Sequence, residues 1–226
     1  MICLFLEGYN IRAPYLSHTM KRILKPEMSV CVIAFSFRES AVRSARDWER
    51  FYGKDSKNYK GIVSGLCAYG IAPEQISSLN YFTDTKTSAM EKIKAADVLY
   101  FPGGLPDKMM ERIREFELES VIKSHEGIFM GYSAGALVLL SEYHLSPDHD
   151  YPAFQYGKGL CVADGFFLEV HDTGAPEQIA AMQKVKSERG KPVYALPLMN
   201  GALLVENGEI SLLGKAKLMQ NEEAVI

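Results

Sequence analysis

The sequence has little cysteine, no excess of positive charge and no long apolar run. Its four cysteines lie far apart and form no Cys-x-x-Cys pair, which argues against a disulfide framework or a thiolate metal site. Three of them stand in apolar, strand-like runs, so we expect buried thiols. A formal net charge of −3 gives no positive field to attract nucleic acid or anionic lipid.

A membrane span is also missing, since no window approaches the ~18 consecutive apolar residues that one requires. The apolar start, residues 1–6, has no basic leader and breaks at Glu7-Gly8. We therefore expect a cytoplasmic protein, a monomer or homodimer, with no nucleic-acid or membrane partner. With 226 residues and an apolar fraction of 47%, the chain can bury one large core, and a single domain is expected.

What the sequence does contain is an alternation of short apolar runs and amphipathic segments. Runs typical of buried strands cover 1–6, 29–35, 76–82, 97–101, 165–170 and 193–196. Helical patterns cover 14–24, 40–52, 84–96, 107–116 and 176–189, residues 142–159 resemble a polar loop, and Asn207-Gly208 indicates a hairpin. The pattern predicts an α/β fold: a doubly wound, mainly parallel sheet with helices on both faces and an antiparallel end.

One stretch, 128–140, joins an apolar run, a Gly-x-Ser-x-Gly turn and a second apolar run. Gly131 and Gly135 permit a tight strand-to-helix turn with Ser133 at its apex. Such a turn presents the hydroxyl at the carboxyl end of a sheet and places the amide of Ala134 where an oxyanion would form. Because the motif alone also occurs by chance, the strand and helix patterns around it are what favour a catalytic serine.

Two further signals accompany the serine turn. Gly103-Gly104 follows the strand-like run 97–101, and glycines there let backbone amides face an anion, although the pair alone is more typical of an ordinary turn. His171 stands at the end of the run 165–170, after the serine in the chain. The other four histidines lie in helix-like or loop stretches, so His171 is the best candidate for a general base.

Together these motifs resemble the dipeptidase E and cyanophycinase family of serine peptidases, whose fold is similar to that of class I glutamine amidotransferases, a flavodoxin-like sheet. The resemblance extends over about 95–215 and rests on the following residues: 98–104, 131–136, 156–160, His171 and 200–208. It implies that residues 1–226 form one peptidase E-like domain.

The resemblance also implies roles for individual residues. Ser133 would be the nucleophile and His171 the base, with an oxyanion hole made by the amides of Gly104 and Ala134. The substrate would be a small or acidic peptide, with no metal or organic cofactor. The expected chemistry is acyl transfer through a Ser-His-acid arrangement.

The acidic third member is expected in the loop between Ser133 and His171. Asp150 is preferred, because Asp150-Tyr151-Pro152 is close to the family pattern. Asp148 in the same loop and Glu169, two residues before His171, are the alternatives.

The sequence departs from the family pattern in two other places. Leu105 stands where family members commonly have Asn, so part of the crevice wall differs. Residues 172–177 replace an arginine-bearing stretch that would grip an acidic side chain bidentately, which argues against a preference for aspartate.

The sequence is also compatible with two other functions. A serine esterase of the α/β-hydrolase kind shares the turn and the order serine, acid, histidine, although the chain has little room for the usual downstream strands. A non-catalytic module could use the crevice at Gly103-Gly104 and Ser133 to hold a small anion.

Overall fold

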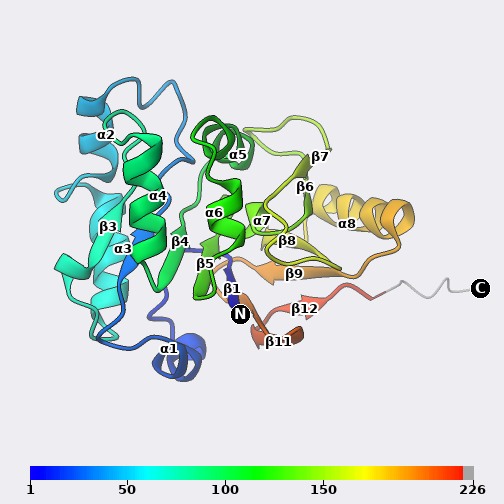
Figure 1. The fold of residues 1–226 in the computed structure, drawn as a ribbon. Coiled ribbons are helices and arrows are strands. Elements are labelled where there is room, and N and C mark those ends of the chain that lie inside the picture. The colour runs from blue at the N-terminus through cyan, green and yellow to red at the C-terminus, as the bar shows by residue number, and fades with distance from the viewer. Residues whose placement is uncertain (221–226) are drawn as a thin grey trace, which may run out of the picture.

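The computed structural model describes residues 1–220, which build a seven-stranded central sheet covered by helices (Figure 1). Five neighbouring strands are parallel, in the order β1 (Ile2–Leu6), β5 (Ile128–Tyr132), β4 (Val98–Phe101), β2 (Val30–Val32) and β3 (Ile76–Ser78). On the other side of β1, the hairpin β10 (Gly201–Glu206) and β11 (Glu209–Gly214) is antiparallel. The predicted mainly parallel α/β sheet with an antiparallel end is confirmed.

Helices cover both faces of this sheet, as its nearly continuous apolar strands require. One face carries α1 (Ser17–Ile23), α2 (Ala45–Tyr52) and α3 (Lys57–Cys67), and the other α4 (Lys86–Ala95), α5 (Pro106–Glu115), α6 (Glu119–Lys123) and α7 (Ala134–Val138). Two short 3-10 turns, Pro14–Leu16 and Pro73–Gln75, complete the connections. Within β1, Leu4 and Leu6 pack toward the first face and Cys3 and Phe5 toward the second. No helix among residues 1–220 is long and apolar enough to cross a membrane.

Beside the central sheet lies a smaller layer, on the right in Figure 1. It contains the three-stranded sheet β12 (Lys217–Leu218), β9 (Val193–Pro197) and β8 (Phe167–Asp172), the pair β6 (Glu142–Leu145) and β7 (Gln155–Lys158), and α8 (Pro176–Arg189). β8 and β9 are parallel. This layer supplies the strand that carries His171.

The β6–β7 hairpin corrects the two ends of the loop expected over 142–159, whereas residues 146–154 between its strands are irregular, as expected. Its polar residues suggested solvent exposure, but they have partners in other elements. Glu142 pairs with Arg189 of α8, and His144 is buried against Glu169 of β8. Alternation of polar and apolar residues over only four positions was too short a signal to identify β6 from the sequence.

The second and third strands are shorter than the sequence indicates. After β3 the chain turns at Asn80, whose carbonyl oxygen accepts the amides of Thr83 and Asp84. After Val32, Ala34 donates back to the carbonyl of Val32 and Phe35 to that of Ile33. Residues 35–37 then contact α5, where Arg112 binds the carbonyl oxygens of Phe35 and Phe37.

Helix α7 packs so closely on β4 that a Cβ at Gly135 would lie 1.9 Å from the carbonyl oxygen of Phe101. We predict that Gly135→Ala lowers the free energy of unfolding by about 1–3 kcal/mol, because backbone must move to admit the methyl group. Urea unfolding measures the change. Gly61→Ala in α3 is the matched control: its nearest neighbour is the Tyr9 ring at 3.5 Å, so the helix should gain up to ~1 kcal/mol. Equal stability of the two variants would contradict the prediction.

Two of the four free cysteines are buried and two are exposed. The expectation of buried thiols is therefore wrong for two of them. Cys3 and Cys31 are buried in β1 and β2, whereas Cys67 and Cys161 are exposed. Burial raises the pKa of Cys3 and of Cys31 to about 12.

At mildly alkaline pH we therefore expect a thiol reagent to modify Cys67 and Cys161 quickly in the native protein. Cys3 and Cys31 should react only after unfolding, because they are inaccessible and stay protonated well above that pH. Counting modified thiols before and after denaturant, by mass spectrometry, tests this expectation. Rapid native modification of all four would contradict the packing of β1 and β2.

Candidate active site

Ser133 occupies a strained turn between β5 and α7. Its φ of 53° and ψ of −121° lie outside the regions that residues with a Cβ favour. Gly131 makes the turn possible, since a Cβ there would lie 2.3 Å from the carbonyl oxygen of Gly135. Both glycines of the Gly-x-Ser-x-Gly motif are thus required by close backbone contacts.

The imidazole of His171 contacts this serine from β8 of the three-stranded sheet. Nε2 of His171 lies 2.8 Å from Oγ of Ser133. His171 has a φ of 56° and stands at a register shift between Val170 and Asp172, where β8 bulges against β9. Bulges re-aim side chains beside active sites. Gln178 of α8 donates to the carbonyl oxygen of His171 at 3.1 Å and helps to hold this backbone conformation.

The carboxylate that contacts the ring is that of Glu7, which sequence reasoning did not single out. Its Oε2 lies 3.2 Å from Nδ1 of His171, and its side chain is 9% exposed. Glu7 follows β1, and β1 pairs with β5 so that Leu6 lies opposite Tyr132. Glu7 and Ser133 are therefore neighbours at the carboxyl edge of the sheet. The available signal was a carboxylate placed directly after the first buried strand.

The three acids considered from the sequence have other partners. Both carboxylate oxygens of Asp150 bind the guanidinium of Arg38. Oδ1 of Asp148 accepts the backbone amides of Asp150 and Tyr151 at 2.8 and 2.7 Å and so closes its own loop. Neither carboxylate is bonded to the ring of His171 in the described structure.

Glu169 is buried in a polar cluster beneath the site. Its carboxylate lies 2.8 Å from Nε2 of His144 and accepts from Ser146 at 2.6 Å and from Gln178 at 2.9 Å. Gln178 in turn binds the backbone of His171. Glu169 thus supports the histidine backbone rather than its ring.

The Gly103-Gly104 turn is held by Ser36. Oγ of Ser36 donates to the carbonyl oxygen of Gly103 at 2.6 Å, and its own carbonyl oxygen accepts the amide of Leu105 at 2.8 Å. Gly104 has a φ of 140°, and a Cβ there would lie 2.3 Å from the carbonyl oxygen of Ser36. Only glycine fits this position.

A buried arginine fixes the segment that carries Ser36. Arg112 of α5 donates to the carbonyl oxygens of Phe35 and Phe37 at 2.6 and 2.8 Å and stacks on the Phe37 ring at 3.7 Å. Burial lowers the pKa of Arg112, and these contacts offset the cost of desolvating its charge. The backbone under Gly104 is therefore rigidly supported.

Two cavities of about 520 Å³ each meet at the serine and histidine. We call the first the loop cavity, since residues of the 144–151 and 168–178 segments line it. The second is called the β1 cavity, since residues 7–10, 12, 13 and 15, which follow β1, line it together with Leu198 and Met199. Gly104, Ser133 and His171 line both, whereas Ala134 faces only the loop cavity.

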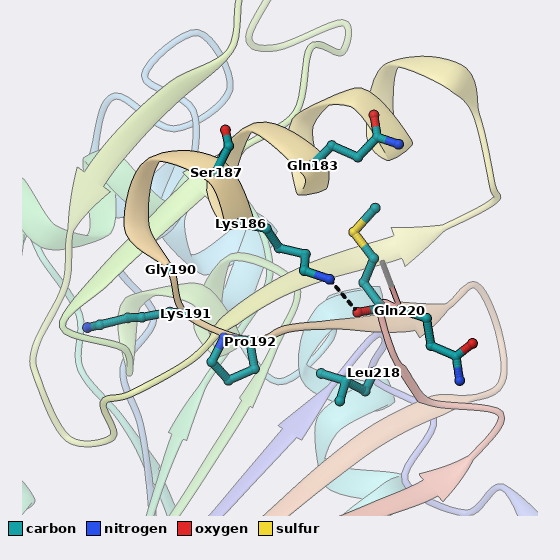
Figure 2. Close-up of a pocket in the computed structure, with 9 residues that line it drawn as sticks. Gln183, Lys186, Ser187, Gly190, Lys191, Pro192, Leu218 and Gln220 are labelled. Carbon is teal, nitrogen blue, oxygen red and sulfur yellow. Dashed lines mark hydrogen bonds between the residues drawn. The ribbon is translucent and has the colours of Figure 1, made fainter. Parts of the chain in front are cut away.

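A cavity of about 700 Å³ lies elsewhere, between α8 and the β12 segment (Figure 2). Its lysines already have partners: Lys186 donates to the carbonyl oxygen of Met219 at 3.0 Å, and Lys191 binds Asp164 at 2.9 Å. It shares no lining residue with the two cavities at Ser133. Within residues 1–220, no three His, Cys, Asp or Glu side chains are grouped to hold a metal ion.

This geometry suits nucleophilic catalysis by a hydroxyl. When Ser133 donates to Nε2, the ring proton lies on Nδ1 of His171 and points to Glu7. A serine, an imidazole and a buried carboxylate in this order form a unit that can remove the serine proton during attack on a carbonyl.

Comparison with solved structures agrees with this fold. A Listeria monocytogenes EGD-e protein, named as a candidate peptidase E, superposes with a TM-score of 0.64 at 13% identity, over 97% of this chain and 98% of that one. A peptidase from an acI-B1 Actinobacterium superposes with a TM-score of 0.62 at 15% identity, over 98% of this chain and 95% of that one. No curated protein sequence matches the chain.

A sequence model of one family also matches. Peptidase family S51 matches residues 58–213, well over half of the chain, and this range includes Gly104, Ser133 and His171. The chain therefore belongs to peptidase family S51 and is a serine-type peptidase.

Proposed function

We propose that this peptidase hydrolyses small peptides through an acyl-enzyme in which Ser133 is the nucleophile, His171 the general base and Glu7 the third member. The observation that carries the proposal is the continuous chain of contacts from Oγ of Ser133 through both ring nitrogens of His171 to Glu7. No residue of the 146–151 loop provides an equivalent contact in the described structure.

The reaction would proceed in two acyl transfers. His171 takes the hydroxyl proton as Oγ of Ser133 bonds to the peptide carbonyl carbon, and it returns that proton to the departing amine when the C–N bond breaks. Water, deprotonated by the same ring, then releases the acyl group as a carboxylic acid. Glu7 keeps the ring proton on Nδ1 and stabilises the imidazolium.

The amides of Gly104 and Ala134 are the proposed oxyanion donors. Both residues line the loop cavity together with Ser133. Ala134 opens α7, and the first amides of a helix have no acceptor within it. Ser36 and Arg112 hold the backbone of Gly104 in place before any substrate arrives, which is how such a donor becomes effective.

Ser133→Ala tests the nucleophile. We expect turnover of a dipeptide library to be lost, and labelling of the protein by a fluorophosphonate to be lost with it, while the circular dichroism spectrum is unchanged. Ser124→Ala is the matched control, since it removes an exposed hydroxyl bonded only to the carbonyl of Val121. It should keep both peptide turnover and fluorophosphonate labelling. Peptide hydrolysis persisting in Ser133→Ala would refute the mechanism. Preferential hydrolysis of simple esters by the wild type would favour an esterase instead.

Glu7→Gln tests the third member, since the amide keeps the shape but loses the charge that stabilises the imidazolium. We expect kcat to fall by about 10³–10⁴-fold, as expected when the ring is left in the wrong tautomer. Asp150→Asn is the comparison variant: it removes a carboxylate of the loop cavity but no contact to His171, so its kcat should fall far less than that of Glu7→Gln. Thermal unfolding of both variants controls for stability. A large loss in Asp150→Asn with little effect in Glu7→Gln would assign the role to the loop instead.

A further inference from the structure

Exposed apolar side chains gather at one side of the proposed active site. Tyr9, Leu198 and Met199 are 59%, 50% and 74% exposed, and all three line the β1 cavity next to Ser133. Single exposed apolar residues are common on proteins, but a group of them around a concave site marks a place for an apolar ligand. The loop cavity has no exposed large apolar side chain in its lining.

The turn that carries Leu198 and Met199 is bonded to β8, the strand of His171. The amide of Leu198 donates to the carbonyl oxygen of Asp172 at 3.1 Å, one residue after His171. Met199 has a φ of 65°, and the turn closes by a bond from the amide of Asn200 to the carbonyl oxygen of Pro197 at 3.1 Å. The backbone that carries the apolar pair is therefore tied to the strand of His171.

The lining of the same cavity includes one exposed arginine. It is Arg12, and in the described part of the chain its guanidinium has no ion pair and no hydrogen bond. The other charged residue of the lining, Glu7, is bonded to His171. An arginine fork is well suited to a carboxylate.

The lining of the loop cavity is more negative than that of the β1 cavity, where one arginine and one carboxylate balance. The loop cavity lining includes four carboxylates, those of Asp148, Asp150, Glu169 and Glu177, against a single guanidinium, that of Arg38, which is bound to Asp150. A substrate carboxylate would be repelled there and is better placed in the β1 cavity. The contrast orients a peptide across Ser133, with its ammonium end toward the loop cavity.

We propose that the β1 cavity binds the carboxyl-terminal residue of the substrate. Its apolar side chain lies against Tyr9, Leu198 and Met199, and its α-carboxylate pairs with Arg12. This assignment rests on the proposed function and specifies its substrate class: short peptides that end in an apolar residue with a free carboxylate. The residue leaves as a free amino acid when the scissile C–N bond breaks, and its amine receives the proton from His171.

The first test compares dipeptides Ala-X, where X is Leu, Phe, Met, Ala, Asp or Lys, and the amide of Ala-Phe. We expect kcat/KM for Leu, Phe and Met to exceed that for Ala and Asp by about tenfold or more, because a filled apolar pocket discriminates to that degree. The amide should be cleaved at least about tenfold more slowly than the free acid. A preference for Asp or Lys, no dependence on X, or equal cleavage of acid and amide would each overturn the proposal.

The second test removes the pocket itself. The double variant Leu198→Ser, Met199→Ser should reduce kcat/KM for Ala-Leu by about tenfold and leave Ala-Ala nearly unchanged. The matched control is Ile210→Ser, Leu212→Ser on β11, which removes two exposed apolar side chains that line neither cavity and should alter neither substrate. Arg12→Gln should remove the difference between Ala-Phe and its amide. Equal effects of the β11 and turn variants would overturn the assignment.

A binding measurement separates this proposal from the mechanism. Titration of Ser133→Ala with Ala-Leu and Ala-Asp, by calorimetry, reports the pocket without turnover, and Ala-Leu should bind at least about tenfold more tightly. Loss of this preference when Leu198→Ser and Met199→Ser are added to Ser133→Ala supports the pocket. It does so even if the wild type cleaves no peptide, in which case only the proposed function fails. Hydrolysis of peptides together with equal binding of the two dipeptides would refute only the pocket.

Discussion

The hydrogen bond between Ser133 and His171 depends on the docking of two sheets. The central sheet presents Ser133 and Glu7 from the ends of neighbouring parallel strands, and the smaller sheet presents His171 from a bulge. The contact between Ser133 and His171 therefore depends on how the two layers are placed. Arg112 supports the backbone beneath Gly104 within the central layer, and Glu169 and Gln178 support the backbone of His171 within the smaller layer.

Backbone strain is concentrated at the same place. Ser133 and His171 both adopt positive φ values, and Gly104 a conformation that only glycine tolerates. Such conformations cost of order 1–3 kcal/mol each and persist only where the surroundings fix them. Here the surroundings are close backbone contacts, such as that of Gly135 on β4, and a buried cation that ties the adjacent segment to α5.

How far the sequence predicts this structure depends on the range of each interaction. The serine turn is local: two glycines at fixed spacing between a strand and a helix determine it, and α8 likewise matches its predicted range because proline begins it and glycine ends it. Glu7 could not be identified in the same way. Its proximity to His171 depends on β1 pairing with β5, more than a hundred residues later, which no local pattern encodes.

The hairpin over 142–159 shows the same limit on a smaller scale. Its polar residues resemble a loop until their partners on β8 and α8 are known. The fold class was predictable from the alternation of apolar runs and helices. The carboxylate that faces the imidazole could be identified only from the order of the strands in the sheet, which the sequence does not show.

The position of β1 has a consequence for synthesis of the protein. This strand lies between β5 and β10, so its complete pairing awaits residues 201–206, and the sheet is rich in contacts between distant segments. Folds of this kind assemble slowly and late. A ribosome-bound fragment would hold the serine turn before the strand that carries the imidazole has emerged, so Ser133 has no His171 partner until β8 has been synthesised.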